Sequence, residues 1–314
     1  MNSKTQKAIS LILTSLFALG GFEALIYILN LNQPGIYLQT AFWLFLFLII
    51  WMAMLFDLHL KNPGSLARAI KRHEAVGHWL HRTGRVCATA VSDRLAHLRR
   101  WRHINLWLHY LLVPSFIFWG TISLFYINFG FPKIQQIIAL LSALALIVGY
   151  MFVKEDLYRK KEVMDDDIFV ALAMIKIYAS AVLFASSLAM LRRFCLPADF
   201  FVLETFAYTF LLIYQALFQH KLVTFKNIAI SLAIAAILGQ AGFFVYLYWG
   251  YNYFTGAIFL SVCYNLLWGA FHYHLDRALT WKALAELLVI SALIAAMVLS
   301  VTNFHARILD GCRF

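Results

Sequence analysis

The chain has 314 residues, of which 63% are hydrophobic and only 13% are charged, and its formal net charge is +11. Soluble domains carry roughly 25% charged residues, so this composition excludes an ordinary water-soluble globular protein. In lipid every backbone polar group must be satisfied within the protein, which leaves helices and closed barrels as spanning structures. The apolar runs here are continuous rather than alternating, so the sequence predicts an all-α, polytopic transmembrane bundle.

Nine apolar segments of transmembrane length follow one another, and each is predicted to be a membrane-spanning helix. In chain order they cover residues 8–29, 35–58, 104–127, 134–153, 168–191, 200–218, 228–249, 254–274 and 283–302. The first is followed at once by the second, so we interpret it as a retained span rather than a signal peptide. The chain is expected to divide into a hairpin over 1–60, a basic segment over 61–103 and a bundle over 104–314.

The positions of Lys and Arg predict the orientation of the spans. Residues 61–103 contain ten basic and two acidic side chains, so this segment and the N-terminus are predicted to be cytoplasmic. Nine alternating spans then place the C-terminus outside the plasma (inner) membrane. Arg192 and Arg193 are the exception, because this topology puts them on the external side. Cys195 and Cys312 fall on that side too, where disulfides form, and a bridge between them is one expectation.

The basic segment over 61–103 is expected to lie on the membrane surface. Its apolar residues recur mostly every three to five positions, which predicts two amphipathic helices in the headgroup plane. We expect it to bind anionic lipid headgroups or, alternatively, a protein partner at the cytoplasmic face. Nucleic acid is not an expected partner, because the segment is tethered between two spans. The basic side chains of this surface are Arg68, Lys71, Arg72, Arg82, Arg85, Arg94, Arg99, Arg100 and Arg102.

Polar side chains inside the spans are the main candidates for a functional site. A charge at the centre of a membrane helix costs at least about 2.5 kcal/mol and usually marks a pathway, a pair or a site. Glu23, Lys176 and Glu204 are expected to face the bundle interior, with at least one acid within salt-bridge reach of Lys176. Gln240 and Asn265 add uncharged polar groups to this predicted intramembrane site. The alternative interpretation is a pair that only fixes helix packing.

Histidines near the cytoplasmic face suggest a metal site only weakly. His78 and His81 are well placed together on a helix, and His220 falls near the same face. His73-Glu74 is followed by His78, which is one residue too long for the zinc-protease spacing. We therefore expect no metal or other cofactor.

Three function hypotheses remain open. The first is a transporter- or permease-like bundle with a polar site near Glu23, Glu204 and Lys176. The second is a non-catalytic membrane scaffold or complex subunit that docks a partner or anionic lipid through residues 61–103. The third is a lipid-modifying membrane enzyme with its histidines at the cytoplasmic face. The sequence has no phosphate-binding loop, dinucleotide fingerprint or nucleophile-elbow motif, so an enzyme is not the favoured interpretation.

Overall fold

The computed structural model describes residues 3–60, 101–159, 166–219, 222–249 and 252–302. Within these ranges nine helices are long and apolar enough to cross a membrane, which confirms the predicted all-α bundle. The predicted spans match them one for one. The helices are α1 (Ser3–Asn30), α2 (Pro34–Leu60), α5 (Trp101–Ile127), α6 (Pro132–Arg159), α7 (Asp166–Arg193), α8 (Ala198–Gln219), α9 (Phe225–Tyr248), α10 (Tyr253–Leu275) and α11 (Trp281–Val301).

Proline and turn residues explain why two of the hairpins close so tightly. Pro34 and Pro132 stand at the first position of α2 and α6, where the missing N–H removes no helical hydrogen bond. The turns before them need a left-handed residue, and Asn32 (φ 59°) and Gly130 (φ 88°) supply it. Both residue types adopt this conformation at low cost.

Side-chain caps start the last three helices. Thr224, Asn252 and Thr280 each accept a hydrogen bond from a backbone N–H three residues later, at the beginning of α9, α10 and α11. This satisfies one of the donors that every helix N-terminus leaves free.

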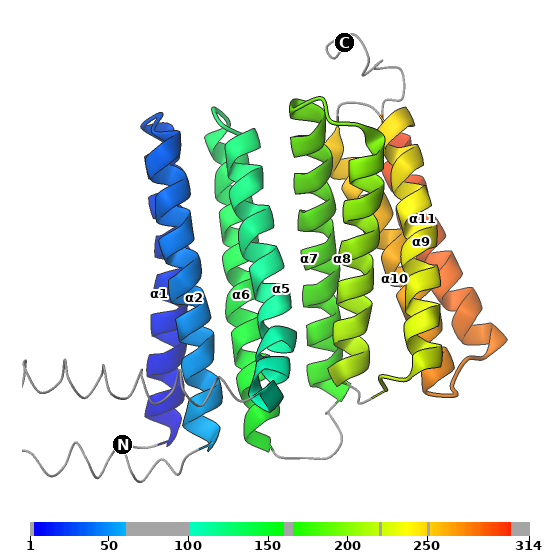
Figure 1. The fold of residues 1–314 in the computed structure, drawn as a ribbon, viewed down its shortest axis with the longest axis horizontal. Coiled ribbons are helices and arrows are strands. Elements are labelled where there is room, and N and C mark those ends of the chain that lie inside the picture. The colour runs from blue at the N-terminus through cyan, green and yellow to red at the C-terminus, as the bar shows by residue number, and fades with distance from the viewer. Residues whose placement is uncertain (1–2, 61–100, 160–165, 220–221, 250–251, 303–314) are drawn as a thin grey trace, which may run out of the picture.

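Successive helices run in alternating directions (Figure 1). We call the end of the bundle that carries residues 31–33, 128–131 and 194–197 the upper end, and the opposite end the lower end. α2 ends and α5 begins at the lower end, so both helix ends that flank residues 61–100 lie there. The odd number of described helices means that α1 begins at the lower end and α11 finishes at the upper end.

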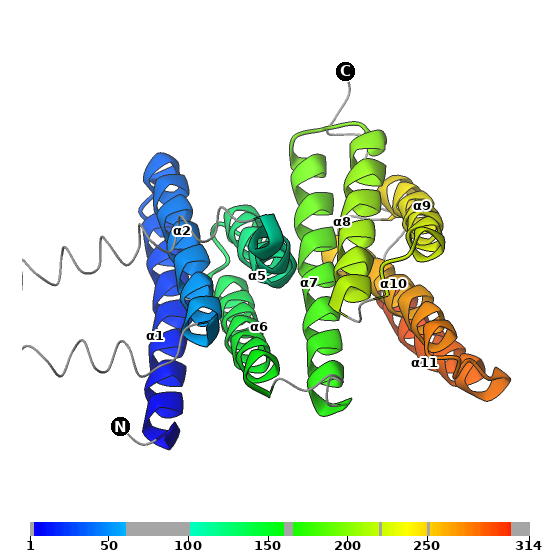
Figure 2. The same cartoon turned by 60° about the horizontal axis from the view of Figure 1, so that its bottom comes forward.

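The helices form two sequential four-helix rings (Figures 1 and 2). In the first ring, α1 packs against α2 and α6, and α5 packs against the same two helices. In the second ring, α7 packs against α8 and α10, and α9 packs against the same two helices. The rings meet where α5 packs against α7 and α8, and α6 against α7. The remaining helix, α11, packs along α10.

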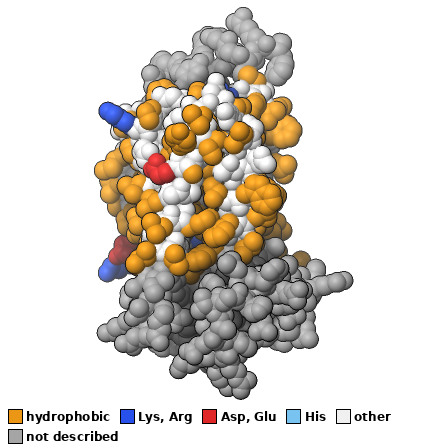
Figure 3. All heavy atoms as spheres, turned by 90° about the vertical axis from the view of Figure 1, so that its left-hand side faces the viewer, with side chains coloured by type: hydrophobic (Ala, Val, Ile, Leu, Met, Phe, Trp, Pro, Cys, Tyr) orange, Lys and Arg blue, Asp and Glu red, His pale blue; other side chains and the backbone are white. Residues whose placement is uncertain are grey.

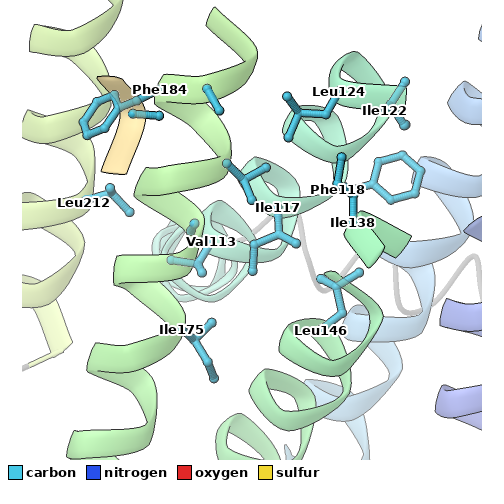
Figure 4. Packing of buried hydrophobic residues seen from close by; sticks show 14 of the residues in the cluster. Val113, Ile117, Phe118, Ile122, Leu124, Ile138, Leu146, Ile175, Phe184 and Leu212 are labelled. Atoms are coloured by element: carbon cyan, nitrogen blue, oxygen red, sulfur yellow. The ribbon is translucent and has the colours of Figure 1, made fainter. Parts of the chain in front are cut away.

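Apolar side chains fill the junction between the rings (Figure 4). Val113 and Ile117 of α5 lie between Leu146 of α6 and Ile175 of α7, and all four are buried. The outer surface is also apolar: the face near α1 and α2 is covered mostly by hydrophobic side chains (Figure 3), among them Phe42 and Trp43. An apolar interior inside an apolar surface is what a bundle solvated by lipid requires.

Candidate functional site

Lys176 is buried inside the bundle, with only 7% of its surface exposed. It lies in α7, ten residues after Asp166 and 17 before Arg193. At 1.5 Å per residue it is therefore about 15 Å from the lower end of the helix and about 26 Å from the upper end. A lysine at this depth is expensive to bury, and by default it marks a functional site.

A small cavity adjoins Lys176 at the junction of the two rings. Its volume is about 30 Å³, and roughly 10–15 Å³ holds one water molecule. Four helices line it: Lys176 comes from α7 and Gln215, which is 2% exposed, comes from α8. The apolar wall includes Val113, Leu146 and Ile175, which Figure 4 labels. The cavity therefore has room for about two water molecules beside a buried amine and a buried amide.

Pro114 lies inside α5, at the wall of this cavity. Because proline has no N–H, it cannot make the hydrogen bond to the carbonyl of Tyr110, four residues earlier, and its ring pushes against that turn. Tyr110 also lines the cavity. Pro114 and Leu146 line a second cavity of about 30 Å³ as well, inside the first ring, where the Trp51 indole donates to the Thr14 hydroxyl at 3.2 Å. Pro114 thus stands between two internal spaces.

Three hydroxyl groups form a chain just above the Lys176 cavity. The Thr121 hydroxyl of α5 donates to the Ser142 oxygen of α6 at 2.6 Å. The Ser142 and Tyr178 hydroxyls are 2.7 Å apart, and either can donate. Ser142 is one turn above Leu146, and Tyr178 is two residues above Lys176, so the chain begins within about 6 Å of the cavity along the helix axes. It links α5, α6 and α7 by polar contacts in the apolar junction.

The structure does not bring Glu23 or Glu204 to Lys176. Glu23 lies in α1, seven residues from its upper end, and is exposed rather than turned to the interior. Glu204 lies six residues into α8 from the upper end. The acids are therefore about 15 and 17 Å from Lys176 along the bundle axis, beyond the reach of these side chains. The expected triad is corrected in this respect: only Lys176 of the three faces the interior of the junction.

The other predicted polar residues also lie apart from the cavity. Glu204 is half-buried beside Tyr208, whose hydroxyl bonds to Ser187 of α7. Gln240 is exposed on α9, and Asn265 is half-buried on α10. These positions do not form one site with Lys176, because none of them lines the cavity.

Gln215 is the site residue that sequence reasoning missed. It lies 17 residues after Ala198, the first residue of α8, and Lys176 lies 17 residues before Arg193, the last of α7. Two antiparallel helices joined by a short turn place such positions at equal height. A polar residue opposite a charged one across a hairpin was therefore a usable signal.

Arg192 and Arg193, which the predicted topology places on the external side, both contact other parts of the protein at the upper end. Arg192 Nη2 donates to the carbonyls of Val245, Tyr246 and Trp249 at 3.1, 3.0 and 2.9 Å. These carbonyls lie at the C-terminal end of α9, where a helix presents its negative pole. Arg193 stacks over the Tyr126 ring at 5.7 Å. The charges at the upper end are thus held by protein groups.

Several predictions fall outside the described residues. The basic residues from Arg68 to Arg100 and the histidines His78, His81 and His220 lie there, and Arg102 belongs to α5 without a described side chain. In the described part of the chain no group of three His, Cys, Asp or Glu side chains could hold a metal ion.

The two described cysteines differ in whether they form a disulfide. Cys195, between α7 and α8 at the upper end, is disulfide-bonded. Cys263 is a free thiol. Cys312 lies outside the described residues, so its expected bridge to Cys195 remains a prediction.

Comparison with known proteins finds no relative. No protein-family model, no curated protein and no solved structure matches this chain.

Proposed function

We propose that this protein is a transporter- or permease-like membrane protein that moves protons, with Lys176 as the ionisable group of its intramembrane site. The observation that carries the proposal is a lysine buried to 7% exposure beside a cavity, five residues or about 8 Å inside the candidate membrane span Ala171–Arg193. An amine takes up a proton to become an ammonium and releases it again, which is the elementary step of proton translocation. Gln215 can donate to or accept from water in the same cavity.

The size of the cavity favours a proton over an organic solute. Ligand pockets for organic molecules measure roughly 300–1,000 Å³, whereas this cavity measures about 30 Å³. Two water molecules and a protonatable amine fit that space. The hydroxyl chain of Thr121, Ser142 and Tyr178 supports a route toward the upper end, because each hydroxyl can both donate and accept a hydrogen bond.

We further propose that the lower end faces the cytoplasm of a cell with this protein in its plasma (inner) membrane. Two independent signals support this orientation. The basic segment over 61–103 connects helices at the lower end, and basic loops are retained in the cytoplasm. Cys195 is disulfide-bonded at the upper end, and disulfides persist in oxidising, external compartments.

Proton flux into liposomes tests the proposal. The purified protein is reconstituted with an entrapped pH-sensitive dye, and a potassium diffusion potential drives protons inward. We expect the parent protein to acidify the lumen faster than protein-free liposomes do. Lys176→Met should lower the rate to that of protein-free liposomes, and Gln215→Leu should lower it in part.

The matched control is Lys226→Met, which removes an exposed lysine at the lower end of α9. It should leave the flux unchanged. All variants must elute as single species in size-exclusion chromatography before their rates are compared. A parent rate equal to that of protein-free liposomes, or a Lys176→Met rate equal to the parent's, would refute proton transport through this site.

A further inference from the structure

Polar side chains form a stripe along α7 that begins at Lys176. Ser180, Leu183 and Ser187 follow it at intervals of four, three and four residues, so all four side chains share one face of the helix. Ser180 is fully buried, and Ser187 is 6% exposed. The stripe therefore carries polar groups through three turns of α7, or about 17 Å, from the Lys176 cavity toward the upper end.

α8 carries a matching stripe. Its members recur at the same three intervals and again share one face of the helix; they are Glu204, Tyr208, Leu211 and Gln215. α7 and α8 pack side by side and are joined by a short turn at the upper end (Figures 1 and 2). Counted from that turn, Gln215 lies at the height of Lys176, and Glu204 lies at the height of Ser187, about 9 Å below the upper end.

Contacts at both ends of the stripes show that the two faces meet. The Tyr208 hydroxyl is hydrogen-bonded to the Ser187 side chain across the two helices, and Lys176 and Gln215 line the same cavity. Side chains on a helix lean toward its N-terminus, which for α8 is the upper end, so Tyr208 reaches Ser187 one turn above its own Cα. The Glu204 carboxylate interacts electrostatically with the Tyr208 hydroxyl.

The Lys176 cavity reaches the height of Tyr208. Its walls include Ile117, which lies ten residues from the upper end of α5, or about 15 Å below it. Tyr208 is ten residues from the upper end of α8. Phe116, next to Ile117, packs edge-on against the Tyr208 ring with 5.5 Å between the ring centroids. The cavity thus extends from the buried amine toward this tyrosine.

We propose that Glu204 is a second proton-carrying group, which exchanges protons between Tyr208 and the upper end. This inference rests on the proposed proton transport through Lys176. A hydroxyl can donate and accept at once, so Tyr208 releases its own proton toward the Glu204 carboxylate as it accepts another from the cavity side. The carboxylate becomes a carboxylic acid and then releases the proton at the upper end. Within the described residues no ion pair holds Glu204, so its charge is not fixed by a basic partner.

The liposome assay for proton flux tests this role. Glu204→Gln keeps the size and hydrogen-bonding capacity of the side chain but cannot titrate. We expect it to lower the rate about tenfold or more, since a positioned acid–base group contributes at least roughly 100-fold to proton transfer. Glu204→Asp keeps a titratable carboxyl and should retain most of the parent rate. A merely structural role predicts the opposite order, because glutamine is the closer match in size. Tyr208→Phe, which removes only the hydroxyl, should lower the rate as well.

Glu23→Gln is the matched control, because it removes an exposed carboxylate at nearly the same depth on α1. It should keep the parent rate. A Glu204→Gln rate equal to the parent's, when Lys176→Met abolishes the flux, would overturn this inference and leave the role of Lys176 intact. Loss of flux in Tyr178→Phe but not in Tyr208→Phe would also overturn it, because the route would then follow the hydroxyls between α5, α6 and α7. A parent protein without flux would overturn both proposals.

Discussion

At the residue scale, Arg192 shows how a charge can be accommodated on the side of the membrane where basic residues are scarce. Its guanidinium closes the end of α9 by donating to three carbonyls, and Tyr246 lies beneath it at 5.6 Å. Hydrogen bonds to a charged group are worth about 1.5–3 kcal/mol. The Arg192 charge therefore stabilises the folded protein, and its position says little about which side of the membrane the upper end faces.

Replacing Arg192 with methionine should lower the free energy of unfolding by about 2 kcal/mol, because the carbonyls at the end of α9 lose their shared donor. Arg193→Met is the natural comparison and should cost about 0.5–1 kcal/mol, the value of an exposed cation–π contact. Thermal unfolding in detergent measures both. Equal melting temperatures for the two variants would contradict the capping role of Arg192.

The sequence predicted the depth of Lys176 in the membrane but not the residues around it. The height of Lys176 in the membrane followed from counting along an apolar span, and its burial agrees with the expectation that it faces inward. Its neighbours could not be derived in the same way. Counting residues along a span gives the depth of a side chain in the membrane. It does not give the direction in which the side chain points, nor which helices pack against each other. Counting therefore did not predict that Glu23 lies on the outer surface beside Gln136, or that α5 and α6 stand between α1 and the helix that carries Lys176.

At the element scale, the helices themselves were well predicted. Continuous apolar runs ended by Pro, Asn or Gly leave little freedom for any other structure in lipid, and the hairpin turns at Asn32 and Gly130 follow from the same residues. The order of packing was not predictable, because every span has an apolar surface all round. Close approach between particular helices depends on single small residues such as Gly120.

Gly120 of α5 sets the contact between the two rings. A Cβ at this position would lie 2.6 Å from Val182 Cγ1 and 3.4 Å from the Val182 carbonyl of α7. β-branched valine has little freedom to move away. Gly120→Ala should therefore destabilise the protein by about 1–3 kcal/mol, despite the better helix propensity of alanine.

Gly20→Ala is the matched control for this prediction, since nothing lies within 4 Å of a Cβ at Gly20. Only the propensity gain of up to about 1 kcal/mol should remain there. Thermal unfolding of both variants in the same detergent provides the comparison. A Gly120→Ala protein as stable as Gly20→Ala would mean that the rings are not in close contact at this position.

At the scale of the whole molecule, the orientation of the bundle decides which end of it faces the cytoplasm. The basic segment and the Cys195 disulfide support the same answer. We predict that Cys87, in a Cys263→Ser background, reacts with a membrane-impermeant thiol reagent only after the cells are opened. Reaction of Cys87 in intact cells would reverse the proposed orientation.

The two-ring architecture places Lys176 where both rings contribute walls to one cavity, and we propose that this amine carries the proton. The most direct measurement is the pH dependence of proton flux in Lys176→His proteoliposomes. An imidazole ordinarily has a pKa near 6.5, against about 10.4 for a lysine amine. We expect the histidine variant to retain flux and to reach its half-maximal rate at a lower pH than the parent does. An unchanged pH profile at an unchanged rate would contradict it, because the proton would then travel without Lys176.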